Sequence, residues 1–115
     1  MMSKNDAILI TSDSLGDGEA ELGVKLMSNY LIALSEGDHL PSHVLLMNRG
    51  VFLAVEEAKT VGTLRTLVEK GVRVLACGTC LDYYNLKDTL AVGEVGNIYM
   101  ARDVMAGADK VITLG

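Results

Sequence analysis

Short aliphatic runs recur along the chain and are separated by stretches with helical spacing. Four of these runs cover residues 7–11, 43–47, 72–76 and 111–114, and each is bounded by glycine or polar residues. Runs of this length and composition are typical of buried strands. A further short strand is expected within residues 86–92, because apolar residues return there after a polar break.

Between these runs, apolar residues repeat about every 3.6 positions, which predicts helices with one buried stripe. The first helix is expected to end near residue 36, and its predicted stripe comprises Leu22, Leu26, Met27, Tyr30, Leu31 and Leu34. Further helices are predicted for residues 61–70 and 97–106, the latter capped by Asn97. Residues 51–55 fit either an extended segment or a helical turn. Strands that alternate with helices predict a single α/β domain over residues 1–115, with a parallel sheet covered on both faces.

The candidate chemistry is concentrated where the strand at 72–76 meets Cys77-Gly78-Thr79-Cys80. Thr79 and Asp82 have the spacing of a helix start, so Thr79 is predicted to be the N-cap. Cys77 would then end a strand, and Cys80 would lie in the first turn of a helix. Backbone N–H groups and the helix dipole meet there and tend to lower the pKa of a thiol. The alternative is that both cysteines are small buried hydrophobic residues.

Other strand ends contribute candidate lining residues for the same cleft. Ser12, Asp13 and Gly16 lie in a polar loop that suits either a phosphate or a plain turn capped by Asp17. The turn is favoured, because acidic side chains in the loop oppose an anion. Asn48, Arg49 and Gly50 follow the second strand, and Arg49 is either a partner for a thiolate or persulfide anion or a solvated surface residue.

The remaining candidates line the cleft close to the cysteines or are set aside. Gly78, Thr79, Tyr83 and Asn97 are expected at its walls, although packing against the sheet is the favoured use of Tyr83 and its neighbour Tyr84. His39 and His43 lie at the opposite edge without a spacing-matched partner, so no metal site is predicted.

Composition and charge narrow the classes of partner. The net charge of −5 makes nucleic acid an unexpected partner. Half of the residues are apolar, which predicts either a sheet covered on both faces or an apolar oligomer interface. Two cysteines cannot form a disulfide framework, so a reducing cytoplasm is expected. The polar start MMSKND and the absence of long apolar runs predict neither a signal peptide nor a membrane span.

Nearly the whole chain resembles the DsrE/DsrF-like family, and more narrowly the carboxyl-terminal domain of YedF-type proteins associated with selenium metabolism. The resemblance is carried by the segments SDSLGDGEAELG, LLMNRGV, CGTCLDYYNL, VGEVGNIY and KVITL. It implies a flavodoxin-like three-layer α/β/α sandwich with a mostly parallel, about five-stranded sheet that assembles into trimers or hexamers. It also implies transfer of sulfur or selenium on a cysteine, a role that falls on Cys77 by position. Cys80 matches a second cysteine found in a subset of such proteins.

The leading hypothesis is therefore a sulfur-relay carrier that holds a persulfide on Cys77 without a cofactor, with Cys80 as a resolving thiol. YedF-type proteins usually carry a TusA-like domain that this chain lacks. Either the expected partner is a separate protein, such as a TusA-like protein or a cysteine desulfurase, or the sequence is part of a longer protein. Three alternatives stay open: a flavin- or nucleotide-binding module, a thioredoxin-type thiol–disulfide oxidoreductase, and a non-catalytic oligomer subunit.

Overall fold

The computed structural model describes residues 5–115 and contains one five-stranded sheet, all parallel, flanked by helices. The expected α/β fold class is confirmed. The strands are β1 Asp6–Ile10, β2 His43–Leu46, β3 Arg73–Cys77, β4 Glu94–Gly96 and β5 Lys110–Leu114. The helices are α1 Ala20–Glu36, α2 Val61–Glu69, α3 Gly78–Tyr83 and α4 Ile98–Gly107, with short 3₁₀ helices η1 Asn48–Ala54 and η2 Lys87–Thr89. Residues 1–4, part of the polar start from which no signal peptide was expected, lie outside the described residues.

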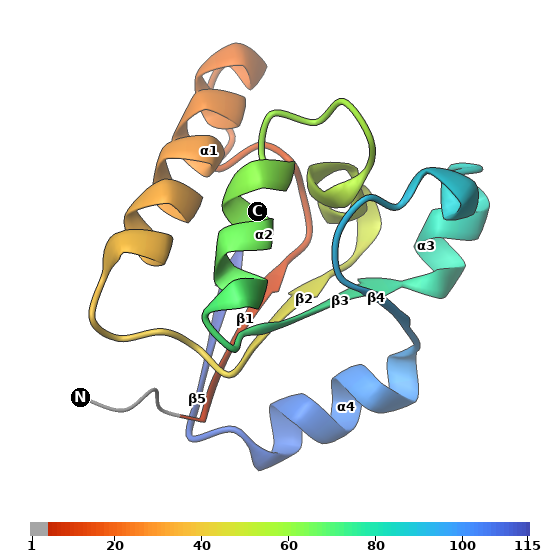
Figure 1. Cartoon of the computed structure of the whole chain (residues 1–115). Helices are drawn as coiled ribbons and strands as arrows, with labels where there is room; N and C mark the ends of the chain where they lie inside the picture. Colours follow the sequence, from red (N-terminus) through yellow and green to blue (C-terminus); the bar gives the residue numbers. More distant parts are fainter. Residues whose placement is uncertain (1–4) are drawn as a thin grey trace.

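The strand order β4-β3-β2-β1-β5 explains which helix covers which face. The chain moves in one direction from β1 to β4, and right-handed crossovers then keep α1, α2 and α3 on one face. The connection from β4 to β5 runs back across the sheet, so the same handedness places α4 on the opposite face (Figure 1). Two separate apolar clusters follow: a large one under α1 and α2, and a small one in which Ala101 of α4 packs on Leu45 and Leu75.

The connections that leave the adjacent strands β3 and β4 lead to helices on opposite faces of the sheet. The chain leaves β3 toward α3 on one face and leaves β4 toward α4 on the other. Open α/β sheets have a crevice beyond the carboxyl ends of strands at such a topological switch point. Cys77 ends β3, and Asn97 follows β4 directly, so both lie at this crevice.

The predicted stripe of α1 is only partly correct. Met27 and Leu31 are fully buried, but Leu22 and Leu26 are 53% and 41% exposed. The buried positions of α1 also include Gly23 and Ser35, which continue the same four-residue spacing. Because aliphatic residues occur nearly all round this helix, the sequence pattern alone assigned too many of them to the core.

The fourth strand is not where the sequence analysis placed it. Residues 86–92 form η2 and a single antiparallel bridge between Leu90 and Val55, whereas β4 occupies a stretch that reads as a loop. β4 has only three residues and two glycines flank or end it, so it carries almost no strand signal. Residues 51–55, left open between two forms, lie mostly in η1.

Two predicted helix caps are wrong, and one is confirmed. Glu19 rather than Asp17 precedes α1. Cys77 rather than Thr79 precedes α3, because the helix starts immediately after the strand and Thr79 is already helical. Asn97 caps α4 as predicted, with its side chain accepting the Met100 N–H at 2.9 Å. No helix within residues 5–115 is long and apolar enough to cross a membrane.

Candidate functional site

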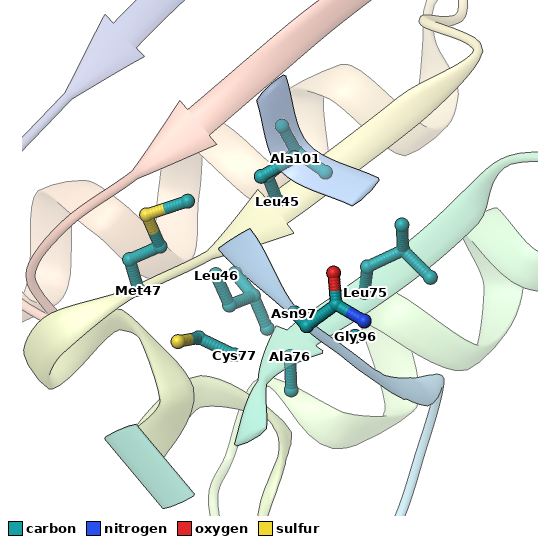
Figure 2. A pocket seen from close by; sticks show the side chains of 9 residues that line it. All are labelled: Leu45, Leu46, Met47, Leu75, Ala76, Cys77, Gly96, Asn97 and Ala101. Carbon is teal, nitrogen blue, oxygen red and sulfur yellow. The ribbon is translucent and has the colours of Figure 1, made fainter. Parts of the chain in front are cut away.

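Cys77 lies at the switch point with two helix starts beside it. It is half-buried, it directly precedes α3, and it lines a small cavity together with Gly96 and Asn97 at the start of α4 (Figure 2). Gly78 fits closely against β4, because a Cβ at this position would lie 3.2 Å from the Gly96 carbonyl oxygen. The structure thus brings Cys77, Gly78 and Asn97 to the same edge of the sheet.

Cys80 faces the end of β2. The backbone N–H of Asn48 donates to its Sγ at 3.1 Å. Asn48 has a φ of +53°, a left-handed conformation that asparagine tolerates better than most residues. This conformation belongs to the turn from β2 into η1, and it brings the Asn48 N–H to the second thiol. The two cysteines are free and close enough for their side chains to interact.

Burial raises the pKa of the Cys80 thiol above its ordinary value. The hydrogen bond from the Asn48 N–H acts in the opposite direction, while the neighbouring Cys77 adds to the increase. The helix-start argument predicted a lowered pKa and is wrong for Cys80. One reason is that α3 has only six residues, so the dipole at its start is small compared with the cost of burying a charge.

We expect Cys80 in the Cys77→Ser variant to react with iodoacetamide only as the pH rises above the range of an ordinary thiol. The thiolate is the reactive form, and burial, the largest cause of the shift, persists when Cys77 is replaced. Alkylation rates measured by mass spectrometry across pH 6 to 11, roughly the range around an ordinary thiol pKa, give the titration curve. A small free thiol measured in parallel is the reference. A Cys80 curve at or below the reference would contradict this prediction.

Arg49 points its guanidinium at Asp13 and an aromatic ring. Its Nε and Nη2 donate to the two carboxylate oxygens of Asp13, both at 3.3 Å. The guanidinium carbon Cζ lies 4.4 Å from the centre of the Phe52 ring. Phe52 in turn packs edge-to-face on Tyr84 at 4.9 Å. Arg49 and Asp13, proposed separately as lining residues, are thus one ion pair that joins the β1 loop to η1.

Tyr83 does not pack against the sheet. Its side chain is 82% exposed and contacts the Tyr84 ring edge-to-face at 5.2 Å. Packing is the role of Tyr84, which joins the core cluster. The preferred interpretation is therefore correct for Tyr84 and wrong for Tyr83.

Ser12 and Gly16 organise their own loop. The Ser12 hydroxyl accepts the Ser14 N–H at 3.0 Å, and Gly16 has a φ of +86°. Near this loop, a groove of about 680 Å³ runs between α1 and residues 52–60, and its lining contains four carboxylates and two lysines. This excess of negative charge is unfavourable for a phosphate. Across residues 5–115, no group of three or more His, Cys, Asp or Glu side chains is placed to hold a metal ion.

Several residues around the thiols were missed by the sequence analysis. Met47 and Ala101 line the cavity beside Cys77, and Phe52 supports Arg49. Met47 and Phe52 belong to apolar runs, and nothing distinguishes them from core residues in a single sequence. Asn48 was identified by its position after a strand, but the donor it offers is its backbone N–H, which no sequence pattern marks.

Several solved structures share this fold at low sequence identity. The ychN protein from E. coli is 21% identical with a TM-score of 0.72, covering 98% of this chain and 100% of its own. Protein MTH1491 of unknown function from Methanobacterium thermoautotrophicum is 20% identical with a TM-score of 0.66, covering 94% and 96%. Protein BT1422, also of unknown function, from Bacteroides thetaiotaomicron is 11% identical with a TM-score of 0.60, covering 96% and 95%.

A comparison with curated protein sequences finds no match. The model of one protein family, by contrast, matches residues 7–114. This range contains both cysteines and all five strands, except for the first residue of β1. The chain therefore belongs to the DsrE/DsrF-like family.

Proposed function

We propose that this protein is a sulfur carrier of the sulfur-relay type, with Cys77 holding the transferred sulfur as a persulfide. The observation that carries the proposal is the position of Cys77 at the carboxyl end of β3, at the switch point, with Cys80 beside it. Membership of the DsrE/DsrF-like family supports the same class of function. Burial raises the pKa of Cys80, which argues against Cys80 as the attacking thiol near neutral pH.

The transfer consists of two thiol exchange steps. The Cys77 thiolate attacks the terminal sulfur of a donor persulfide, the donor S–S bond breaks, and the donor leaves as a thiolate. An acceptor thiolate then attacks the sulfur held on Cys77, which returns to a thiolate. Cys80 provides a side reaction: its thiolate attacks Sγ of Cys77, forms the Cys77–Cys80 disulfide and releases hydrosulfide.

The narrower assignment rests on the sequence resemblance to the carboxyl-terminal domain of YedF-type proteins. We propose on that basis that the carried atom is sulfur or selenium, and that a cysteine desulfurase or a TusA-like protein supplies or receives it. The exposed position of Tyr83, the last residue of α3, leaves room for such a partner to approach.

The direct test is intact-mass spectrometry of the wild-type protein after incubation with a cysteine desulfurase and cysteine. We expect a mass increase of one sulfur atom that disappears on adding dithiothreitol. Boiled desulfurase is the control for non-enzymatic sulfur. A protein that gains no sulfur here, or from a small-molecule persulfide, would rule out the carrier function.

We also expect the protein to be an oligomer. Two groups of exposed apolar side chains are present: Leu22 and Leu26 on α1, and Val95, Ile98 and Tyr99 at the end of β4 and the start of α4. Apolar area of this kind is usually covered by a partner surface. Light scattering at roughly tens of micromolar, where modest interfaces populate, should give a mass above the 12.3 kDa of one chain. Leu26→Glu and Ile98→Glu variants would identify the group involved, and a clean monomer in the wild type would contradict the prediction.

A further inference from the structure

A small apolar cavity lies beside Cys77, between the sheet and α4. Its volume is about 10 Å³, room for about one small atom. The residues that matter here are Cys77, Met47, Leu75, Gly96, Asn97 and Ala101. Figure 2 shows Cys77 and Met47 on one side of it and Leu75 on the other. The cavity is thus lined in part by the cysteine that is proposed to carry sulfur.

The lining of this cavity is unsuited to water. A buried water typically needs two to four polar partners. Among the lining side chains only Asn97 offers an amide, and its carbonyl oxygen already accepts the Met100 N–H. The other contributors are aliphatic or sulfur-containing side chains and the Gly96 backbone. Such a surface suits a polarisable apolar atom such as sulfur, which makes favourable dispersion contacts with carbon and sulfur.

We infer that this cavity receives the terminal sulfur of a Cys77 persulfide, an inference that rests on the proposed function. The atom enters bonded to Sγ of Cys77 after the donor S–S bond breaks. Because an apolar lining disfavours the anion, the persulfide takes up a proton from solvent as it enters, and no charge is buried. The apolar walls then cover part of its surface and slow the approach of water and dissolved thiols. Delivery to an acceptor requires rotation of the persulfide out of the cavity, because an attacking thiolate must reach the terminal sulfur.

The test fills the cavity and measures how well the sulfur is protected. Ala101 is 5% exposed, and Ala101→Val adds two methyl groups to its lining. In a Cys80→Ser background, which removes the internal resolving reaction, the persulfide is loaded and its loss to dithiothreitol is followed by intact mass. We expect loss about fourfold faster in the filled variant, the ratio that corresponds to burial of one methylene-sized group. Alkylation of unloaded Cys77 should keep its rate.

Ala106→Val is the matched control, because Ala106 lies on the same helix with its side chain exposed. Gly96→Ala is a second variant, in case Ala101→Val disturbs packing of α4. Its Cβ would lie 3.3 Å from Leu75 Cβ and 3.9 Å from Met100 Sδ, so Leu75 must shift by a few tenths of an ångström to admit it. Thermal melts of all variants establish that they fold.

The possible outcomes distinguish failure of the sulfur cavity from failure of the proposed carrier function. Faster loss in Ala101→Val or Gly96→Ala but not in Ala106→Val supports the sulfur cavity. A persulfide that loads on Cys77 and is lost at one rate in every folded variant overturns the cavity and leaves the carrier function standing. Failure of the Cys80→Ser protein itself to load sulfur overturns both the cavity and the assignment of Cys77 as the carrier.

Discussion

Replacing Cys77 with serine is expected to abolish sulfur loading completely, whereas replacing Cys80 should raise the amount of persulfide severalfold. Both variants keep residues of nearly the same size, so the site around β3 and α3 should be retained. Cys77 is assigned the attack because it ends β3 at the switch point. Cys80 is assigned the resolving reaction because its side chain interacts with that of Cys77. Intact mass after incubation with a persulfide donor measures loading in the three proteins side by side.

The difference between wild type and Cys80→Ser should widen as the pH rises. Burial raises the pKa of Cys80, so near neutral pH this thiol is mostly protonated and attacks the persulfide slowly. Its thiolate fraction grows as the pH approaches that raised pKa, and release of hydrosulfide should accelerate in the wild type alone. The measurement is the half-life of the loaded protein at several pH values, without added reductant.

Two results would reverse these assignments. If Cys77→Ser gains sulfur and Cys80→Ser does not, Cys80 is the carrier, stabilised by the Asn48 N–H that it accepts at 3.1 Å. If both single variants load equally, then either cysteine can hold the sulfur, and the two thiols of the CxxC pair are interchangeable as carriers. The Cys77→Ser/Cys80→Ser double variant provides the background for non-specific sulfur addition.

The fold could be predicted from sequence because four of its strands are aliphatic, and three of these lie in the interior of a parallel sheet. β1, β2 and β3 are mostly buried, and such strands read as nearly continuous apolar runs. β4 was missed because it lies at the sheet edge, has three residues and is held by its pairing with β3 rather than by side-chain burial. The exposed face of α1 was misassigned for the opposite reason: it is apolar without being part of the chain's own core.

The site was predictable to the extent that it depends on strand ends. Cys77 ends β3, Asn48 lies just after β2 and Asn97 follows β4, and parallel strands bring their carboxyl ends to one edge. What remained hidden depends on backbone geometry and packing in three dimensions. The N–H that reaches Cys80 follows from a positive φ at Asn48, and the cavity follows from the separation of α4 and the sheet.

Gly50→Ala is expected to destabilise the fold strongly, by about 3 kcal/mol, the upper end of the usual cost of overpacking. Gly50 is buried where η1 crosses the end of β1. A Cβ there would collide with the carbonyl oxygen of Ile10 and lie 3.0 Å from its carbon. That oxygen also accepts a hydrogen bond from the Met47 N–H at 3.0 Å, so the oxygen cannot move away without breaking this hydrogen bond. Gly50, proposed from sequence as a lining residue, therefore has a structural reason to be glycine.

The measurement is urea unfolding at one fixed protein concentration, because oligomer formation would make stability depend on concentration. Gly62→Ala is the matched control: a Cβ on this residue of α2 meets nothing within 4 Å, and alanine should stabilise the helix by about 0.5–1 kcal/mol. Opposite signs for the two substitutions would confirm the close approach at Gly50. Equal midpoints for Gly50→Ala and wild type would show that β1 and η1 are further apart. The contact also holds the turn at Asn48, so partly folded Gly50→Ala protein should show Cys80 alkylation closer to that of an ordinary thiol.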